Sequence, residues 1–172
     1  MNNKIFKLIT GTLLIMVFSV FTSCDEGGDQ DPGATSVVEM AGDWWVVALE
    51  EDGVTPAYGG DYVHFSTYNT AANDGGMWID DDFNWMEIKT KVITNTSNLT
   101  FIGDDGIEVL YGGAVTVTNG AITKGTYTTA SNTAVDEIYF EAEFDWAAGT
   151  NFIFKGHKRT GFLEDENPHY SN

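Results

Sequence analysis

The sequence predicts an all-β protein, a small antiparallel barrel of about eight strands that follows a leader and a flexible tether. From Gly42 onward, apolar and polar residues alternate with the period of two that is typical of strands. Clusters of Gly, Asp and Asn interrupt these runs at short intervals, as turns between antiparallel strands would. Closure into a barrel is favoured because about eight or nine short strands would otherwise leave exposed sheet edges.

The first 23 residues have the features of a bacterial signal peptide. Lys4 and Lys7 supply a positive start, residues 8–21 an apolar core, and Thr22 and Ser23 the small residues of a cleavage site. The apolar run is too short to span a membrane, because a transmembrane helix needs about 20 apolar residues. We therefore expect residues 1–23 to be removed.

Cys24 is the only cysteine of the chain, so no disulfide within the chain can involve it. Together with Phe21, Thr22 and Ser23 it resembles the lipobox of bacterial lipoproteins, which implies that Cys24 carries acyl chains. The alternative is an ordinary secreted protein with an unmodified cysteine. Residues 24–37 have almost nothing to bury and are expected to form the tether, with the barrel domain at 38–172.

The two acidic residues after the cysteine, Asp25 and Glu26, indicate a location. They resemble the sorting signal that sends lipoproteins of Bacteroidetes-type bacteria to the outer face of the outer membrane. We expect an outer-membrane lipoprotein that is attached through its acyl chains. Exposure at the cell surface and an orientation toward the periplasm both remain open.

The charge of the chain limits its partners. It holds 26 acidic and eight basic residues; without residues 1–23, which contain two of the basic ones, 149 residues with a formal charge of −20 remain. Nucleic acid is excluded as a natural partner because it would be repelled. Most carboxylates are expected on a solvated surface, and the alternative is that some of them hold calcium.

The clearest predicted strand is 136–146. One face carries Ile138, Phe140, Ala142, Phe144 and Trp146, and the other carries Tyr139 and acidic residues. Asn119 and Gly120 form the strongest hairpin signal and predict a turn between strands at 107–117 and 121–128. Further strands are expected at 43–50, 61–68, 77–79, 83–92, 99–102 and 150–160.

Three acidic clusters, at 73–74, 80–82 and 104–106, are expected to be turns, because Asp, Asn and Gly tolerate tight conformations. Asp74 and residues 80–82 are the candidates for a weak calcium site, although their spacing is not that of the twelve-residue calcium loop. Neither a phosphate-binding glycine loop nor a pair of zinc ligands is found in the sequence. We therefore predict no cofactor and no metal.

The segment 83–92 departs from the alternation. Met86, Ile88 and Val92 share one face, whereas Phe83 and Trp85 fall in phase with charged residues. Either a bulge switches the face, or the two aromatic residues lie at the rim of the barrel.

Two features resemble the lipocalin-like, or calycin, barrels. Residues 42–44 match the Gly-x-Trp of their first strand, and Arg159 lies near the end of the last predicted strand. The resemblance implies that Arg159 packs across Trp44 and that this pair closes the barrel. The strand alternation instead favours Lys158, unless Gly156 marks a bulge.

Longer segments resemble a specific family. Residues 44–46, 68–74, 77–81, 156–162 and 164–166 are similar to the Bacteroidetes lipoproteins called lipid-binding putative hydrolases. The resemblance covers nearly the whole mature chain. It implies a lipocalin-like barrel with a lipid ligand, and it brings no catalytic motif.

The leading interpretation is a membrane-anchored module that binds a lipid or another apolar small molecule inside the barrel. The inward positions expected to contact the ligand are Phe65, Met86, Ile88, Tyr111, Phe140, Phe144, Phe152 and Phe154. Space for the ligand is expected from the small residues Gly113, Ala114, Ala142 and Gly156.

Two alternatives remain. The first is a hydrolase of lipids or esters, for which the sequence has neither Gly-x-Ser-x-Gly nor His-Glu-x-x-His. His64 and Ser66 would stand on one strand face about 6.6 Å apart, too far for an easy direct hydrogen bond, and His157 is expected at the surface or the barrel closure. The second is a surface module that binds carbohydrate or protein through Trp78, Phe83 and Trp85.

Overall fold

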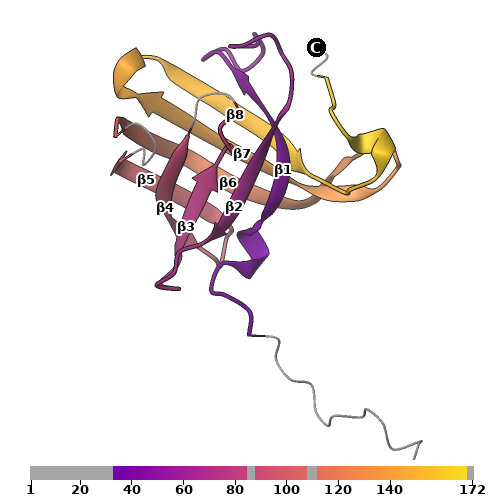
Figure 1. Ribbon diagram of the computed structural model, residues 1–172, viewed down its shortest axis with the longest axis horizontal. Helices are drawn as coiled ribbons and strands as arrows, with labels where there is room; N and C mark the ends of the chain where they lie inside the picture. Colours follow the sequence, from indigo (N-terminus) through magenta and orange to yellow (C-terminus); the bar gives the residue numbers. More distant parts are fainter. Residues whose placement is uncertain (1–32, 85–87, 108–111, 170–172) are drawn as a thin grey trace, which may run out of the picture. The chain divides into compact units, whose positions relative to one another are not determined.

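Eight antiparallel strands form a closed barrel, in which each strand pairs with the next and β8 returns to β1 (Figure 1). The computed structural model describes residues 33–84, 88–107 and 112–169. The strands are β1 (Gly42–Leu49), β2 (Val63–Asn69), β3 (Gly76–Asp80), β4 (Lys89–Asn95), β5 (Thr100–Ile107), β6 (Ala114–Thr128), β7 (Ala134–Phe144) and β8 (Asn151–Lys158). Three short 3-10 helices accompany them: η1 (Val38–Met40), η2 (Asp145–Ala147) and η3 (Leu163–Asp165). The predicted all-β barrel is confirmed.

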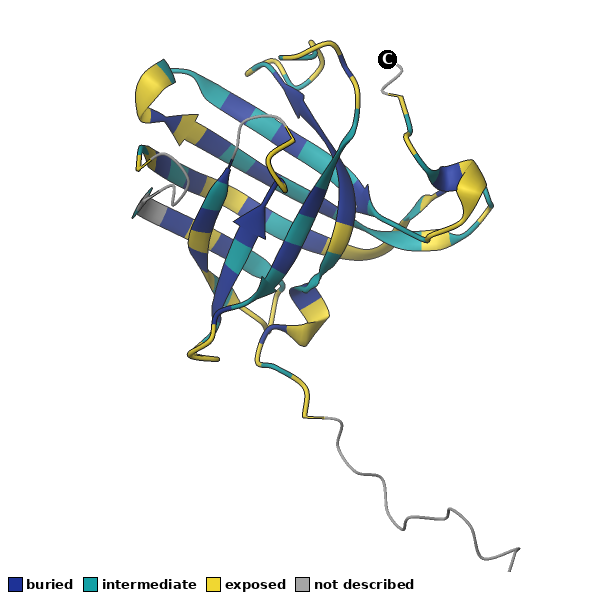
Figure 2. Cartoon of the chain, in the orientation of Figure 1, coloured by how far each residue is buried: buried dark blue, intermediate teal, exposed yellow. Residues whose placement is uncertain are grey.

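Burial alternates along the strands as the sequence pattern predicts (Figure 2). In β7, Ile138, Phe140, Ala142 and Phe144 are buried, while Glu143 between the last two is exposed. Alternate side chains of a strand point to opposite faces, so the apolar set lines the barrel and the acidic set faces outward.

The hairpin predicted at Asn119 and Gly120 is wrong. β6 continues through both residues, and the register of β6 against β7 shifts between Thr118 and Ala121. Asn119 adopts a φ of 53°, and a Cβ on Gly120 would clash with the ring of Phe101. The pair therefore forms a bulge that admits this ring.

Two further predictions fail, and the position of Phe83, one of the two aromatic residues in question, is resolved. Residues 104–106 lie within β5 and not in a turn; Gly106 sits there because a Cβ would lie 2.5 Å from Thr90 Oγ1. The strand expected at 83–92 begins only at Lys89. Phe83 lies in the preceding turn with a φ of 62° and 65% of its surface exposed, at the rim of the barrel.

The other two acidic clusters form turns, as expected. Asn73 has a φ of 49° in the connection from β2 to β3. After β3, the backbone N–H groups of Asp82 and Phe83 donate to the carboxylates of Asp80 and Asp81, respectively. Short polar side chains thus hold the backbone of this turn.

Aromatic rings occupy the middle of the barrel. Phe140 stacks on Phe154 at a centroid distance of 4.6 Å, and Phe65 and Phe101 lie 6.2 Å and 6.0 Å from Phe140. None of the four is more than 1% exposed. The short helix η1 packs next to β2 and contributes the fully buried Met40 to the core.

β1 is buried on both faces. Its inward side chains belong to the barrel core, but Trp45, Val47 and Leu49 on the outer face are also buried. The connection to β2 folds back onto this face, because Leu49 forms a β-bridge with Pro56. The segment after β8 covers it too, since Arg159 lies over Trp45.

Candidate functional site

Four aromatic side chains gather where β7 ends and β8 begins, and we call them the mouth cluster: Tyr58, Phe144, Trp146 and Phe152. Trp146 stacks on Phe144 at 5.1 Å and lies 5.9 Å from Phe152, measured between ring centroids. Tyr58, from the connection between β1 and β2, lies 6.5 Å from Phe152. Trp146 is 58% exposed, whereas Phe144 is 2% exposed, so the cluster leads from solvent to the core.

The structure brings together most of the side chains that the sequence assigned to a ligand. Phe144 lies 6.5 Å from Phe154, which joins the mouth cluster to the rings inside. Ile88 is fully buried in the same core. The other two expected contacts, Met86 and Tyr111, lie outside the described residues.

The middle of the barrel is filled at the level of these rings. Phe65, Phe140 and Phe154 have no exposed surface, and a cavity that could admit water would leave some. An eight-stranded barrel is just wide enough for side chains to fill it. Among the described residues, the mouth cluster is therefore the group of aromatic side chains that a ligand can contact from solvent.

The small residues expected to leave room have different roles. Ala142 is buried in the core as expected, but Ala114 faces outward and is exposed, because Val115 and Val117 take the inward positions. A Cβ on Gly156 would clash with the carbonyl oxygen of Trp45, so this glycine allows β1 and β8 to approach. Gly113 lies against the Asp145 carboxylate.

The predicted pairing of Trp44 with Arg159 is wrong. The register of β1 against β8 sets Trp44 opposite Lys158, whose Nζ lies 5.8 Å from the centroid of the Trp44 ring. Arg159 is one residue further on and lies outside the barrel, 5.0 Å from the ring of Trp45. It also forms an ion pair with Glu166 at 2.8 Å.

The residues of the expected outer platform lie on different elements. Trp78 is half-buried on β3, opposite Tyr68 of β2 and Lys91 of β4. Phe83 is exposed in the turn after β3, and Trp85 lies outside the described residues.

His64 and Ser66 lie close together on β2, but they are joined through carboxylates. His64 Nδ1 is 2.5 Å from Asp82 and Nε2 is 3.4 Å from Asp43. Ser66 Oγ lies within hydrogen-bond distance of the same two aspartates, 3.3 Å from Asp82 and 3.2 Å from Asp43, and its single proton can be donated to either. An activated serine requires a base that accepts its proton, and here the hydroxyl bonds to carboxylates that the imidazole also contacts. The sequence did not predict either aspartate as a partner, because both reach β2 from other elements.

His157 is buried, in contrast to the surface position that was one of its two expected places. It lies opposite Trp45 in the pairing of β8 with β1, so it belongs to the barrel closure, which was the other expected position.

Among residues 33–84, 88–107 and 112–169, no three His, Cys, Asp or Glu side chains are grouped so as to hold a metal ion. The part of the chain that the structure describes contains no helix long and apolar enough to cross a membrane.

Comparison with known proteins identifies the family of the chain. The sequence profile of a family described as "Lipid-binding putative hydrolase" matches residues 29–163, more than half of the chain. No protein with a curated description matches the chain. By the length of this match and the closed eight-stranded barrel, the chain belongs to this lipid-binding family.

Proposed function

We propose that the protein binds a lipid or another apolar small molecule at the mouth of its barrel and does not hydrolyse it. The mouth cluster carries this proposal, because Trp146 offers an exposed apolar surface that continues through Phe144 and Phe152 into the core. Membership of the lipid-binding family and the barrel fold support a ligand of this class. Apolar surface buried by such a ligand would favour binding by about 25 cal/mol per Å².

We also propose that the barrel is held at the outer membrane by acyl chains on Cys24. The support is the sequence alone, since residues 1–32 lie outside the described part of the chain. This acidic chain does not have the excess of basic residues that attracts proteins to anionic lipids, so acyl chains would provide the attachment to the membrane.

The absence of hydrolysis rests on the arrangement of His64 and Ser66. Both contact Asp43 and Asp82, and this geometry does not present the imidazole as a base to the hydroxyl. Ester substrates should therefore not be consumed above the blank rate.

The test is titration of the protein with a fluorescent fatty acid, followed by tryptophan emission. Trp146→Ala should weaken binding, and Phe162→Ala is the matched control because Phe162 is an aromatic residue of similar exposure, 52% against 58%. Equal affinity of Trp146→Ala and the wild type would place the site elsewhere. Failure of the wild type to take up any lipid, or saturable ester turnover, would contradict the proposal.

A further inference from the structure

A second concave site lies outside the barrel, beneath the C-terminal segment. The end of β6 and the start of β7 extend past the barrel, and the chain after β8 runs alongside them (Figure 1). Between them is a pocket of about 180 Å³. Its wall is formed by Tyr127, Thr129, Ala130 and His157 on one side and by residues 164–168 on the other.

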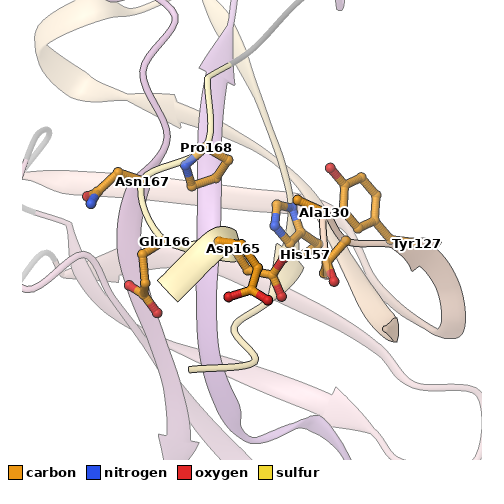
Figure 3. Close-up of a pocket in the computed structure, with 9 residues that line it drawn as sticks. Tyr127, Ala130, His157, Asp165, Glu166, Asn167 and Pro168 are labelled. Atoms are coloured by element: carbon orange, nitrogen blue, oxygen red, sulfur yellow. The ribbon is translucent and has the colours of Figure 1, made fainter. Parts of the chain in front are cut away.

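The imidazole of His157 is the central group of this pocket. Figure 3 shows it between Tyr127 and the C-terminal segment. Tyr127 stacks on it at 4.1 Å, and Tyr62 meets it edge-on at 5.6 Å. His157 is only 3% exposed, yet its buried Nδ1 has no hydrogen-bond partner among the described residues. Because buried polar atoms nearly always have a partner, Nδ1 is a group that a ligand in this pocket would satisfy.

The opposite wall is acidic. Asp165 is buried and already saturated, since Ser131 donates to it through its N–H and its hydroxyl and Thr160 through its hydroxyl. Glu166 is paired with Arg159. Glu164 is exposed and has no such partner within the described part of the chain. Three carboxylates against one guanidinium favour a cation in the pocket over an anion.

We propose that this pocket binds a small primary ammonium group, which donates hydrogen bonds to His157 Nδ1 and to the carboxylate of Glu164. A cation that carries N–H donors satisfies both an acidic wall and an acceptor nitrogen. A metal ion is disfavoured, because no group of ligands with the required arrangement is found among the described residues. The volume suits a few non-hydrogen atoms, since a water molecule alone occupies about 30 Å³.

The protonation state of the imidazole agrees with this role. Burial lowers the pKa of His157, and the nearby carboxylates of Asp165 and Glu137 oppose this effect only in part. The ring is therefore neutral at pH 7, which leaves one ring nitrogen free to accept a hydrogen bond.

The full-length protein should be titrated with ethanolamine by calorimetry, with tetramethylammonium as a cation of similar size that has no N–H donor. Ethanolamine should bind saturably and tetramethylammonium should not. Glu164→Gln should weaken ethanolamine binding about tenfold, as expected for loss of one charge-assisted hydrogen bond. Glu51→Gln is the matched control, because it removes one exposed carboxylate far along the chain from the pocket.

A second variant tests the acceptor itself. His157→Phe keeps a ring that can stack on Tyr127 but removes Nδ1, and it should abolish binding in a protein whose thermal unfolding is still cooperative. Should it fail to fold, Glu164→Gln on the exposed surface still decides. Equal binding of the two cations, or unchanged affinity in Glu164→Gln, would overturn the proposal, as would no binding of ethanolamine.

Two sources could provide the ammonium group, and they can be separated. Tighter binding of glycerophosphoethanolamine than of ethanolamine would assign the pocket to a phospholipid head group, and the reverse order to a free amine. The pocket shares no residue with the mouth cluster. Trp146→Ala should therefore leave amine binding unchanged, so failure of one proposal is distinguishable from failure of the other.

Discussion

Phe140 and Phe154 stack face to face inside the barrel, with ring planes only 2° apart and directly opposite positions on β7 and β8. Each is fully buried, and Phe65 packs against both of them. Through Phe65 of β2, the pair links two neighbouring strands to a third strand that lies beyond β1, which makes it a principal source of stability.

Phe154→Ala should lower the free energy of unfolding by about 3 to 5 kcal/mol, because it removes a buried ring and leaves a cavity. Urea denaturation would measure the loss. The control Phe162→Ala, at an exposed position, should change stability by about 0.5 kcal/mol or less. A loss as small as the control's would mean that the barrel is hollow at this level.

The seam between β1 and β8 gives a second prediction. Lys158 lies over Trp44, and Arg159 lies over Trp45. A double-mutant cycle of Trp44→Phe with Lys158→Met should give a coupling of about 0.5 to 2 kcal/mol, since the cation is partly shielded from water. The cycle of Trp44→Phe with Arg159→Met should be additive. Coupling in the second cycle and not in the first would contradict the register of this seam.

The sequence predicted the parts of the fold that depend on local alternation. β7 is the clearest case, because its inward residues are consecutive alternate positions on one strand. The closure of the barrel was inferred from the number of short strands, and the resemblance to lipocalin-like barrels from the Gly-x-Trp at residues 42–44. The turn at Asn119 and Gly120 was predicted wrongly, since the Phe101 ring that requires this glycine comes from a different strand.

The candidate sites were harder to predict for the same reason. The inward aromatic residues followed from strand phase, but Tyr58 joins the mouth cluster from a long connection without periodicity. The pocket at His157 depends on Tyr127 and on residues after β8, which meet only through the tertiary fold. One feature of the sequence does point to a buried His157. The alternation of β8 places Phe154 inside the barrel and His157 on its outer face, and this strand pairs with β1, which is buried on both faces.

The proposed lipid anchor at Cys24 gives the third prediction. Cys24→Ala should move the protein from the membrane fraction to the soluble fraction, because each acyl chain contributes about 0.8 kcal/mol per buried CH₂ group. Fractionation followed by immunoblotting would measure the shift, with Ser23→Ala as a control that keeps a small residue before the cysteine. Retention of the Cys24→Ala protein in the membrane would rule out acylation as the attachment.

The last prediction concerns pH. Burial lowers the pKa of His157 below the ordinary histidine value of 6.5, so the unfolded chain takes up this proton at a higher pH than the folded protein does. Stability from the neutral ring is thus fully present above pH 6.5 and is lost as pH falls through this value toward the folded pKa. Between pH 7.5 and 5.5, the free energy of unfolding should fall more steeply for the wild type than for His157→Phe. Identical slopes for the wild type and His157→Phe would mean that the imidazole titrates as freely in the folded protein as in the unfolded chain, and would remove the neutral acceptor on which the ammonium pocket depends.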